Sequence, residues 1–144
     1  MIEMFDCVDE NDCVLGQESR EEVHRKGIYH RAVHIFARSD SGKWILQRRS
    51  AEKDTEPLLW TTTCSGHVDA GESYEDAAIR EFQEEVGVEV NHLELLELLR
   101  LSPCLETGNE FVRVYVNKNI VSPVPNLAEI LELEDFSISE INRL

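Results

Sequence analysis

The chain has 144 residues, which suits one globular domain and is enough to bury a core without disulfide or zinc support. Its net charge of −15, from 29 acidic and 14 basic residues, argues against a protein that binds the DNA or RNA backbone. A small phosphorylated substrate is still compatible with this charge if carboxylates bind a divalent cation that screens it.

No segment reaches the roughly 18 apolar residues that a membrane helix needs. The acidic segment 1–6 lacks the basic and then apolar pattern of a signal peptide. We therefore expect a cytoplasmic protein with no membrane partner, whose four cysteines are free thiols. The sequence is also compatible with a homodimer.

The first half of the chain predicts a hairpin, a short helix and then a series of strands. Ser19 and Glu22 have the spacing of a helix capping box, and Gly27 is suited to end the helix that they begin. Alternating or β-branched runs bounded by polar turns predict strands at 4–8, 13–17, 30–38, 43–49 and 61–63.

The second half begins with a glycine-containing loop, residues 66–72, and a helix. Ser73 is a good N-cap for a helix over 74–86, and Gly87 is suited to follow its last turn. Further strands are predicted at 93–101, 110–121 and 130–136, before the start of a helix at 137–144. The whole chain, residues 1–144, reads as a single α+β domain.

Three glutamates of the predicted helix project from one side. Glu81, Glu84 and Glu85 are related by steps of three and four residues, which places them on one helical face. Taken alone, such a stretch is usually a solvated acidic surface. A divalent cation would instead use these carboxylates as hard oxygen ligands and remove their mutual repulsion. The helix by itself does not decide between these interpretations.

The segment before the helix decides between a solvated acidic surface and a cation site. Residues 66–88 have the form G-x5-E-x7-R-E-U-x-E-E-x-G-U, where U is apolar. This pattern resembles the Nudix box with every fixed position filled; only the aromatic Phe82 stands where an aliphatic residue is commoner. Nine matched positions make chance agreement far less probable than for a short glycine motif.

The resemblance implies a Nudix fold, an α/β/α sandwich built on a mixed β-sheet. It implies that Mg²⁺ or Mn²⁺ is bound by Glu81, Glu84 and Glu85, with a further ligand from the carbonyl of Ser65 or Gly66. The residues that it implies brace the loop and orient the carboxylates are Gly66, Gly71, Glu72, Arg80 and Gly87.

The implied function is Mg²⁺-dependent hydrolysis of a diphosphate linkage in a nucleoside-diphosphate-type compound or a related small phosphorylated metabolite. A bound cation neutralises charge at phosphorus and acidifies a water, from which a carboxylate takes the proton. Glu81 and Glu110 are both candidates for this base. With Glu85 they form the expected catalytic set.

Outside the box, looser matches resemble the branch that includes type I isopentenyl-diphosphate isomerases and hydrolases related to them. His30 and His67 match metal ligands of the isomerases, and we expect both to lie at the substrate site. Arg48 and Arg49 alternate across a strand, so only one can face the cleft; we expect Arg48 to contact substrate phosphate.

An isomerase is an alternative, but the sequence departs from its pattern. Ser65 stands where the catalytic cysteine belongs, Cys64 is one residue early, and Gly108 replaces one of two acidic residues. His24 is one residue out of register with a third ligand. The complete set of glutamates favours the hydrolase. A third alternative, a non-catalytic nucleotide-binding scaffold, would not need them. Substrate identity is not readable from these residues.

Relatives usually end in a full helix packed on the sheet, whereas this sequence stops a few residues into that helix, at 140–144. The C-terminal helix therefore looks shortened. Either the chain itself is shortened or a partner subunit covers the apolar surface that the helix would bury.

Overall fold

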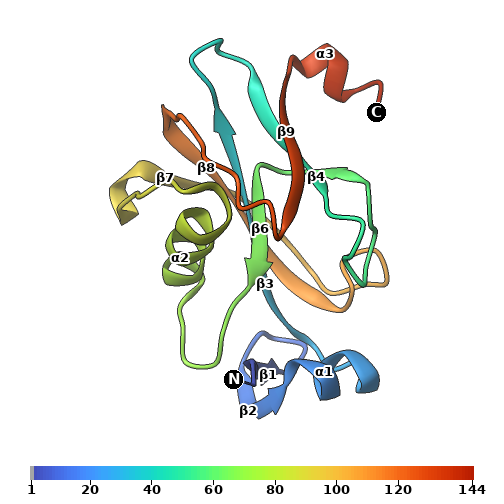
Figure 1. Ribbon diagram of the computed structural model, residues 1–144. Coiled ribbons are helices and arrows are strands. Elements are labelled where there is room, and N and C mark those ends of the chain that lie inside the picture. The colour runs from blue at the N-terminus through green and yellow to red at the C-terminus, as the bar shows by residue number, and fades with distance from the viewer. Residues whose placement is uncertain (1) are drawn as a thin grey trace.

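The computed structural model describes residues 2–144; Met1, the first residue of the acidic N-terminal segment, lies outside the described residues. Two sheets and three α-helices make up the fold (Figure 1). The strands are β1 (Met4–Val8), β2 (Val14–Ser19), β3 (His30–Arg38), β4 (Trp44–Arg49), β5 (Trp60–Thr61), β6 (Cys64–His67), β7 (Leu95–Leu101), β8 (Glu110–Ile120) and β9 (Ile130–Phe136). The helices are α1 (Arg20–Lys26), α2 (Tyr74–Val86), α3 (Ile138–Ile141) and the short 3-10 helix η1 (His92–Glu94).

The larger sheet is mixed and has seven strands. Its main path runs β5-β4-β3-β8-β7, while β6 also pairs with β3 and β9 with β4. Among the strand pairs that residues 2–144 form in this sheet, only the central pair, β3 with β8, is parallel. Because that pair runs in one direction, His30 and Glu110 lie opposite each other at the beginning of both strands. The sheet thereby brings together two residues that are 80 positions apart in sequence.

Helix α2 forms where its caps and apolar face predict. The Ser73 side chain accepts a hydrogen bond from the Asp76 N–H, and Gly87 ends the helix in the left-handed conformation with φ of 67°. Phe82 and Val86 are fully buried in the main core together with residues of β3, β6 and β9. Burying this face fixes the rotation of α2 and turns its glutamates toward β6.

The β1–β2 hairpin and α1 form a small unit against the start of β3. Phe5 is buried with Val23 of α1, and its ring stacks on His30 at a centroid distance of 5.6 Å. The hairpin also holds the loop before α2, because Asp6 accepts a hydrogen bond from the Gly71 N–H and the Met4 carbonyl accepts one from the Ala70 N–H.

The α+β class and the mixed sheet are confirmed, and most predicted elements lie within a few residues of their observed bounds. The expected loop at 66–72 is partly wrong, because Gly66 and His67 form the end of β6 through pairing with Val33 and Ala32. All four cysteines are free thiols. Within residues 2–144, no helix has the length and apolar content needed to cross a bilayer.

Candidate active site

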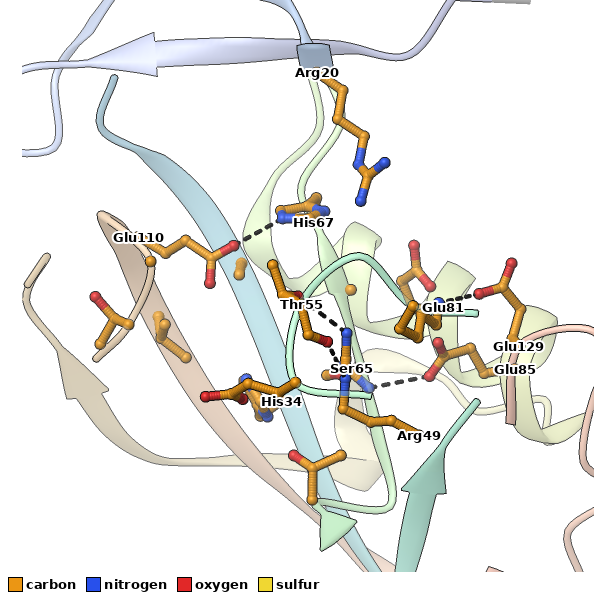
Figure 2. A pocket seen from close by; sticks show the side chains of 18 of the residues that line it. Arg20, His34, Arg49, Thr55, Ser65, His67, Glu81, Glu85, Glu110 and Glu129 are labelled. Atoms are coloured by element: carbon orange, nitrogen blue, oxygen red, sulfur yellow. Dashed lines mark hydrogen bonds and ion pairs between the residues drawn. The ribbon is translucent and has the colours of Figure 1, made fainter. Parts of the chain in front are cut away.

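A cleft of about 980 Å³ opens between α2, β6 and the beginning of β8 (Figure 2). This volume is at the upper end of the range of small-molecule sites. One wall carries the three glutamates of α2, and Glu110 lies across the cleft from them (Figure 2). The end of β4 and the loop that follows it close a further side with the cations Arg49 and Lys53.

Glu85 is the most enclosed of the three glutamates, with 7% of its surface exposed. Its Oε1 accepts hydrogen bonds from Gln47 Nε2 and from the Ser65 N–H, each at 3.1 Å. Burial raises the pKa of Glu85, although these two hydrogen bonds act in the opposite direction. A β4 side chain and a β6 amide therefore fix one oxygen, which leaves the other free for a ligand.

Glu81 lies against the backbone of β6. A Cβ on Gly66 would be 2.2 Å from the Glu81 carboxyl carbon, so the missing side chain is what admits this carboxylate. Burial raises the pKa of Glu81 to about 7, against the effect of a hydrogen bond from Arg80. The close approach of Glu81 explains the glycine at position 66.

Arg80 connects the loop to the helix. Its Nε and Nη2 each donate to the Glu72 carboxylate at 2.8 Å, and Nη2 also donates to the His67 carbonyl at 3.1 Å. Its Nη1 donates to Glu81 at 2.7 Å and to Glu84 at 3.2 Å. Glu84 is the most exposed of the three, at the rim of the cleft, with 58% of its side chain accessible.

The α2 carboxylates are of the chemical type that binds a divalent cation. Glu81 and Glu85 lie in one cleft, and burial raises the pKa of both, although Arg80 beside Glu81 and Lys53 near Glu85 act in the opposite direction. Arg80 is shared with Glu72, so it does not neutralise the set. Hard carboxylate oxygens at such a point suit Mg²⁺ or Mn²⁺. The residues placed to hold it are Glu81 and Glu85, with Glu84 at the rim.

Glu110 is held by histidines. Its Oε2 lies 2.8 Å from His67 Nε2 and 3.3 Å from His30 Nε2. Burial would raise the pKa of Glu110, but the contacts with both histidines outweigh it and hold the pKa at about 2. Glu110 therefore enters the cleft as a carboxylate that already has partners.

His24 joins the same group, although the sequence comparison placed it out of register. The ligand atoms of His24, His30 and His67 lie within 4.8 Å of one another. The Nε2 atom of His30 is buried and makes no regular hydrogen bond within the described residues. Imidazole nitrogens are good ligands for transition metals. Together with Glu110, these imidazoles form a second set of groups that could hold such an ion.

Two predicted substrate contacts are placed differently by the structure. Arg48 does not line the cleft, because its Nε donates to the Leu58 carbonyl and its guanidinium lies 3.7 Å from Glu132. The alternation of β4 places Arg49 there instead. His30 is buried behind Glu110 with 1% exposure, so it supports the site without facing the cleft, whereas His67 lines it.

Cys64 faces the core rather than the cleft. It is fully buried in the cluster that contains Phe82 and Val86, and burial raises the pKa of its thiol well above the usual range. Ser65, the next residue of β6, lines the cleft in its place. The strand therefore presents no thiol to a substrate at this position.

The acidic cleft lies beside a helix and a preceding loop that Arg80 ties together, on an α+β fold. The NUDIX domain model matches residues 28–144. The chain therefore belongs to the Nudix family, and its fold is the Nudix fold.

Individual relatives support this assignment. An uncharacterized Nudix hydrolase of Nostoc sp. is 36% identical over 91% of this chain and 78% of its own. Isopentenyl-diphosphate Delta-isomerase 2 of Photorhabdus laumondii is 30% identical over 100% and 82%. The crystal structure of DR0079 from Deinococcus radiodurans superposes with a TM-score of 0.82 at 30% identity, covering 96% of this chain and 86% of that one.

Proposed function

We propose that this Nudix protein is a Mg²⁺-dependent hydrolase that cleaves a diphosphate linkage in a nucleoside-diphosphate-type compound or a related small phosphorylated metabolite. The observation that carries the proposal is the pair Glu81 and Glu85, whose carboxylates are held by hydrogen bonds and lie largely buried in one cleft. A family known for hydrolases supplies the reaction type.

The first role of the chain is to hold the cation ligands before substrate arrives. Gln47 and the Ser65 amide orient Glu85, while Arg80 and the absent side chain of Gly66 place Glu81. Preorganised ligands avoid reorganisation at the moment of reaction. A cation bound there would stabilise the charge that develops on phosphorus and lower the pKa of a coordinated water.

The second role is to take the proton of the attacking water. Glu81 and Glu110 both line the cleft. Two histidines already contact Glu110, which favours Glu81 as the base and Glu110 as the residue that fixes His67 at the cleft wall. On this basis we propose Glu81 and Glu85 as the catalytic residues and Glu110 as a positioning residue that acts through His67.

The third role is to bind the phosphates not held by the cation. Arg49 and Lys53 also line the cleft, where Arg49 donates hydrogen bonds to Thr55 and Lys53 pairs with Glu129. Guanidinium and ammonium groups are the usual ligands of phosphate oxygens. We propose that Arg49, together with His67, contacts the substrate.

The test is hydrolysis of a panel of nucleoside, sugar-nucleotide and prenyl diphosphates, with Mg²⁺ and with EDTA. Wild-type protein should release phosphate or nucleotide only with the metal. Glu85→Gln should reduce kcat by about a hundredfold or more, since it removes a ligand charge. Glu89→Gln, an exposed site outside the cleft, is the matched control and should retain activity. No metal-dependent release from any compound would refute the proposal.

A second candidate, isomerisation of a prenyl diphosphate, is favoured by the histidine group around Glu110 and by the isomerase relatives. The burial of Cys64 opposes it, because the thiol cannot reach a substrate carbon. Isopentenyl diphosphate followed by NMR separates the two: a shifted double bond with intact diphosphate supports the isomerase, and released phosphate supports the hydrolase.

A further inference from the structure

His34 lines the cleft but belongs neither to the acidic helix nor to the histidine group. It lies in the middle of β3, opposite Ser65 of β6 and Val114 of β8, and its side chain lines the cleft (Figure 2). Its Nδ1 lies 2.8 Å from the hydroxyl oxygen of Thr62. That same hydroxyl lies 3.1 Å from the Cys64 carbonyl oxygen.

These two contacts fix the position of the proton on the imidazole. A carbonyl oxygen only accepts, so the single proton of the Thr62 hydroxyl is donated to Cys64. The hydroxyl oxygen must then accept from His34. Both contacts are hydrogen bonds only if Nδ1 of His34 carries the proton, which leaves a bare lone pair on Nε2.

That lone pair is open to the cleft. The Nε2 atom of His34 makes no hydrogen bond among residues 2–144 and, unlike Nε2 of His30, is not sealed in the interior. Burial lowers the pKa of His34, which disfavours the charged imidazolium. The cleft therefore presents a fixed acceptor at this point rather than a cation.

The wall around His34 is partly apolar. Ala32 and Val112, on the same face of the sheet, line the cleft together with Leu101, while Arg49 and Glu110 lie near the imidazole on its other sides. The apolar part of this wall suits the flat face of a base or sugar ring better than a charged phosphate. The phosphate groups belong near Arg49 and the glutamates.

We propose that Nε2 of His34 accepts a hydrogen bond from a hydroxyl or amino group on the organic part of the substrate, which makes the substrate a nucleoside- or sugar-linked diphosphate rather than a hydrocarbon one. This inference rests on the proposed function. A prenyl chain has no donor for the lone pair and would leave it unpaired on binding, which is how polar sites reject apolar analogues.

The first experiment reads the tautomer directly and needs no activity. In a ¹H–¹⁵N long-range spectrum of the full chain at pH 7, His34 should show a protonated Nδ1 and a bare Nε2. Thr62→Ser should keep that pattern, while Thr62→Val should mix the tautomers. A wild-type spectrum with the proton on Nε2 would overturn the proposal.

The second experiment compares substrates. His34→Phe should lower kcat/KM for the best nucleotide or sugar-nucleotide of the panel by about tenfold or more, since an unmet donor remains. Hydrolysis of inorganic triphosphate, which has no organic part, should change less than about twofold. His34→Gln, whose amide oxygen accepts, should recover most of the loss. Equal losses on both substrates would overturn the proposal.

The two proposals fail in different ways. If wild-type protein hydrolyses nothing, the proposed function fails, and titration with adenosine and uridine diphosphates still tests His34. A shift of its Nε2 resonance with either nucleotide, absent with isopentenyl diphosphate, supports the acceptor role. A resonance unmoved by both nucleotides, or moved equally by isopentenyl diphosphate, contradicts it.

Discussion

Glu81 occupies the space that a side chain at Gly66 would fill, with its carboxyl carbon 2.2 Å from the position of the missing Cβ. Strand β6 and helix α2 can approach this closely only because position 66 has no side chain. The backbone of Gly66 does not need a positive φ, so the constraint is one of space alone.

Gly66→Ala should therefore displace Glu81 while leaving the fold intact. A metal ligand misplaced by about 1 Å can cost about a hundredfold in rate, so we expect kcat to fall by that order. Gly16→Ala is the matched control, because nothing lies within 4 Å of its added Cβ and its φ is ordinary. Circular dichroism checks folding, and an active Gly66→Ala protein would contradict this geometry.

Gln47 and Glu85 provide a second test, because the Gln47 amide donates to the carboxylate from β4. Gln47→Met should preserve volume but remove one of the two hydrogen bonds to the Glu85 oxygen and leave the one from the Ser65 N–H. We expect the Mg²⁺ concentration for half-maximal activity to rise about tenfold or more, as for other partners of metal ligands. In Gln83→Met, an exposed position on α2, the metal requirement should be unchanged; a similar change in both variants would argue against this role of Gln47.

The parts of the site that local sequence determines could be predicted. Ser73 and Gly87 cap α2 through contacts within a few residues, so the bounds of the helix were correct. The faces of Glu81 and Phe82 follow from helical geometry alone. The loop–helix motif then indicated the family, whose assigned span begins at residue 28.

The parts that depend on pairing between distant strands could not be predicted. Which of Arg48 and Arg49 faces the cleft is set by the register of β4 against β9, and a shift of one residue reverses the choice. His24 lies on α1, and only the packing of Phe5 brings it to His67, at a ring distance of 5.4 Å. Gln47 gave no signal, because its partner is 38 residues away.

The pKa of Glu81 predicts how the metal-free protein responds to pH. A carboxyl group whose pKa rises from 4.5 to about 7 on folding stabilises the protein while it is protonated. That contribution is complete below about pH 4.5 and is lost as pH rises through about 7. In EDTA at pH 8, ionised Glu81 should therefore cost about 3 kcal/mol relative to a neutral amide.

Glu81→Gln should thus be more stable than wild type at pH 8 without metal, and the difference should shrink toward pH 5. Urea unfolding in EDTA measures the free energy of unfolding of both proteins at each pH. Glu89→Gln, at an exposed position, should show no such dependence. Added Mg²⁺ should stabilise wild type more than Glu81→Gln, since the cation binds the native carboxylate. If the difference in stability between Glu81→Gln and wild type were the same at pH 5 and pH 8, the raised pKa of Glu81 would be wrong.

Cys64 separates the two candidate reactions by its orientation. Because the pleat of β6 turns Cys64 into the core and Ser65 into the cleft, a reaction that needs a thiol at this strand has none. Cys64→Ala should leave kcat for the hydrolase reaction within about twofold and cost about 1 kcal/mol of stability, the loss of one small buried group. Cys104→Ala, an exposed thiol, should change neither quantity. Loss of all catalysis in a folded Cys64→Ala protein, with Cys104→Ala fully active, would mean that the thiol reaches the substrate and that the isomerase is the correct assignment.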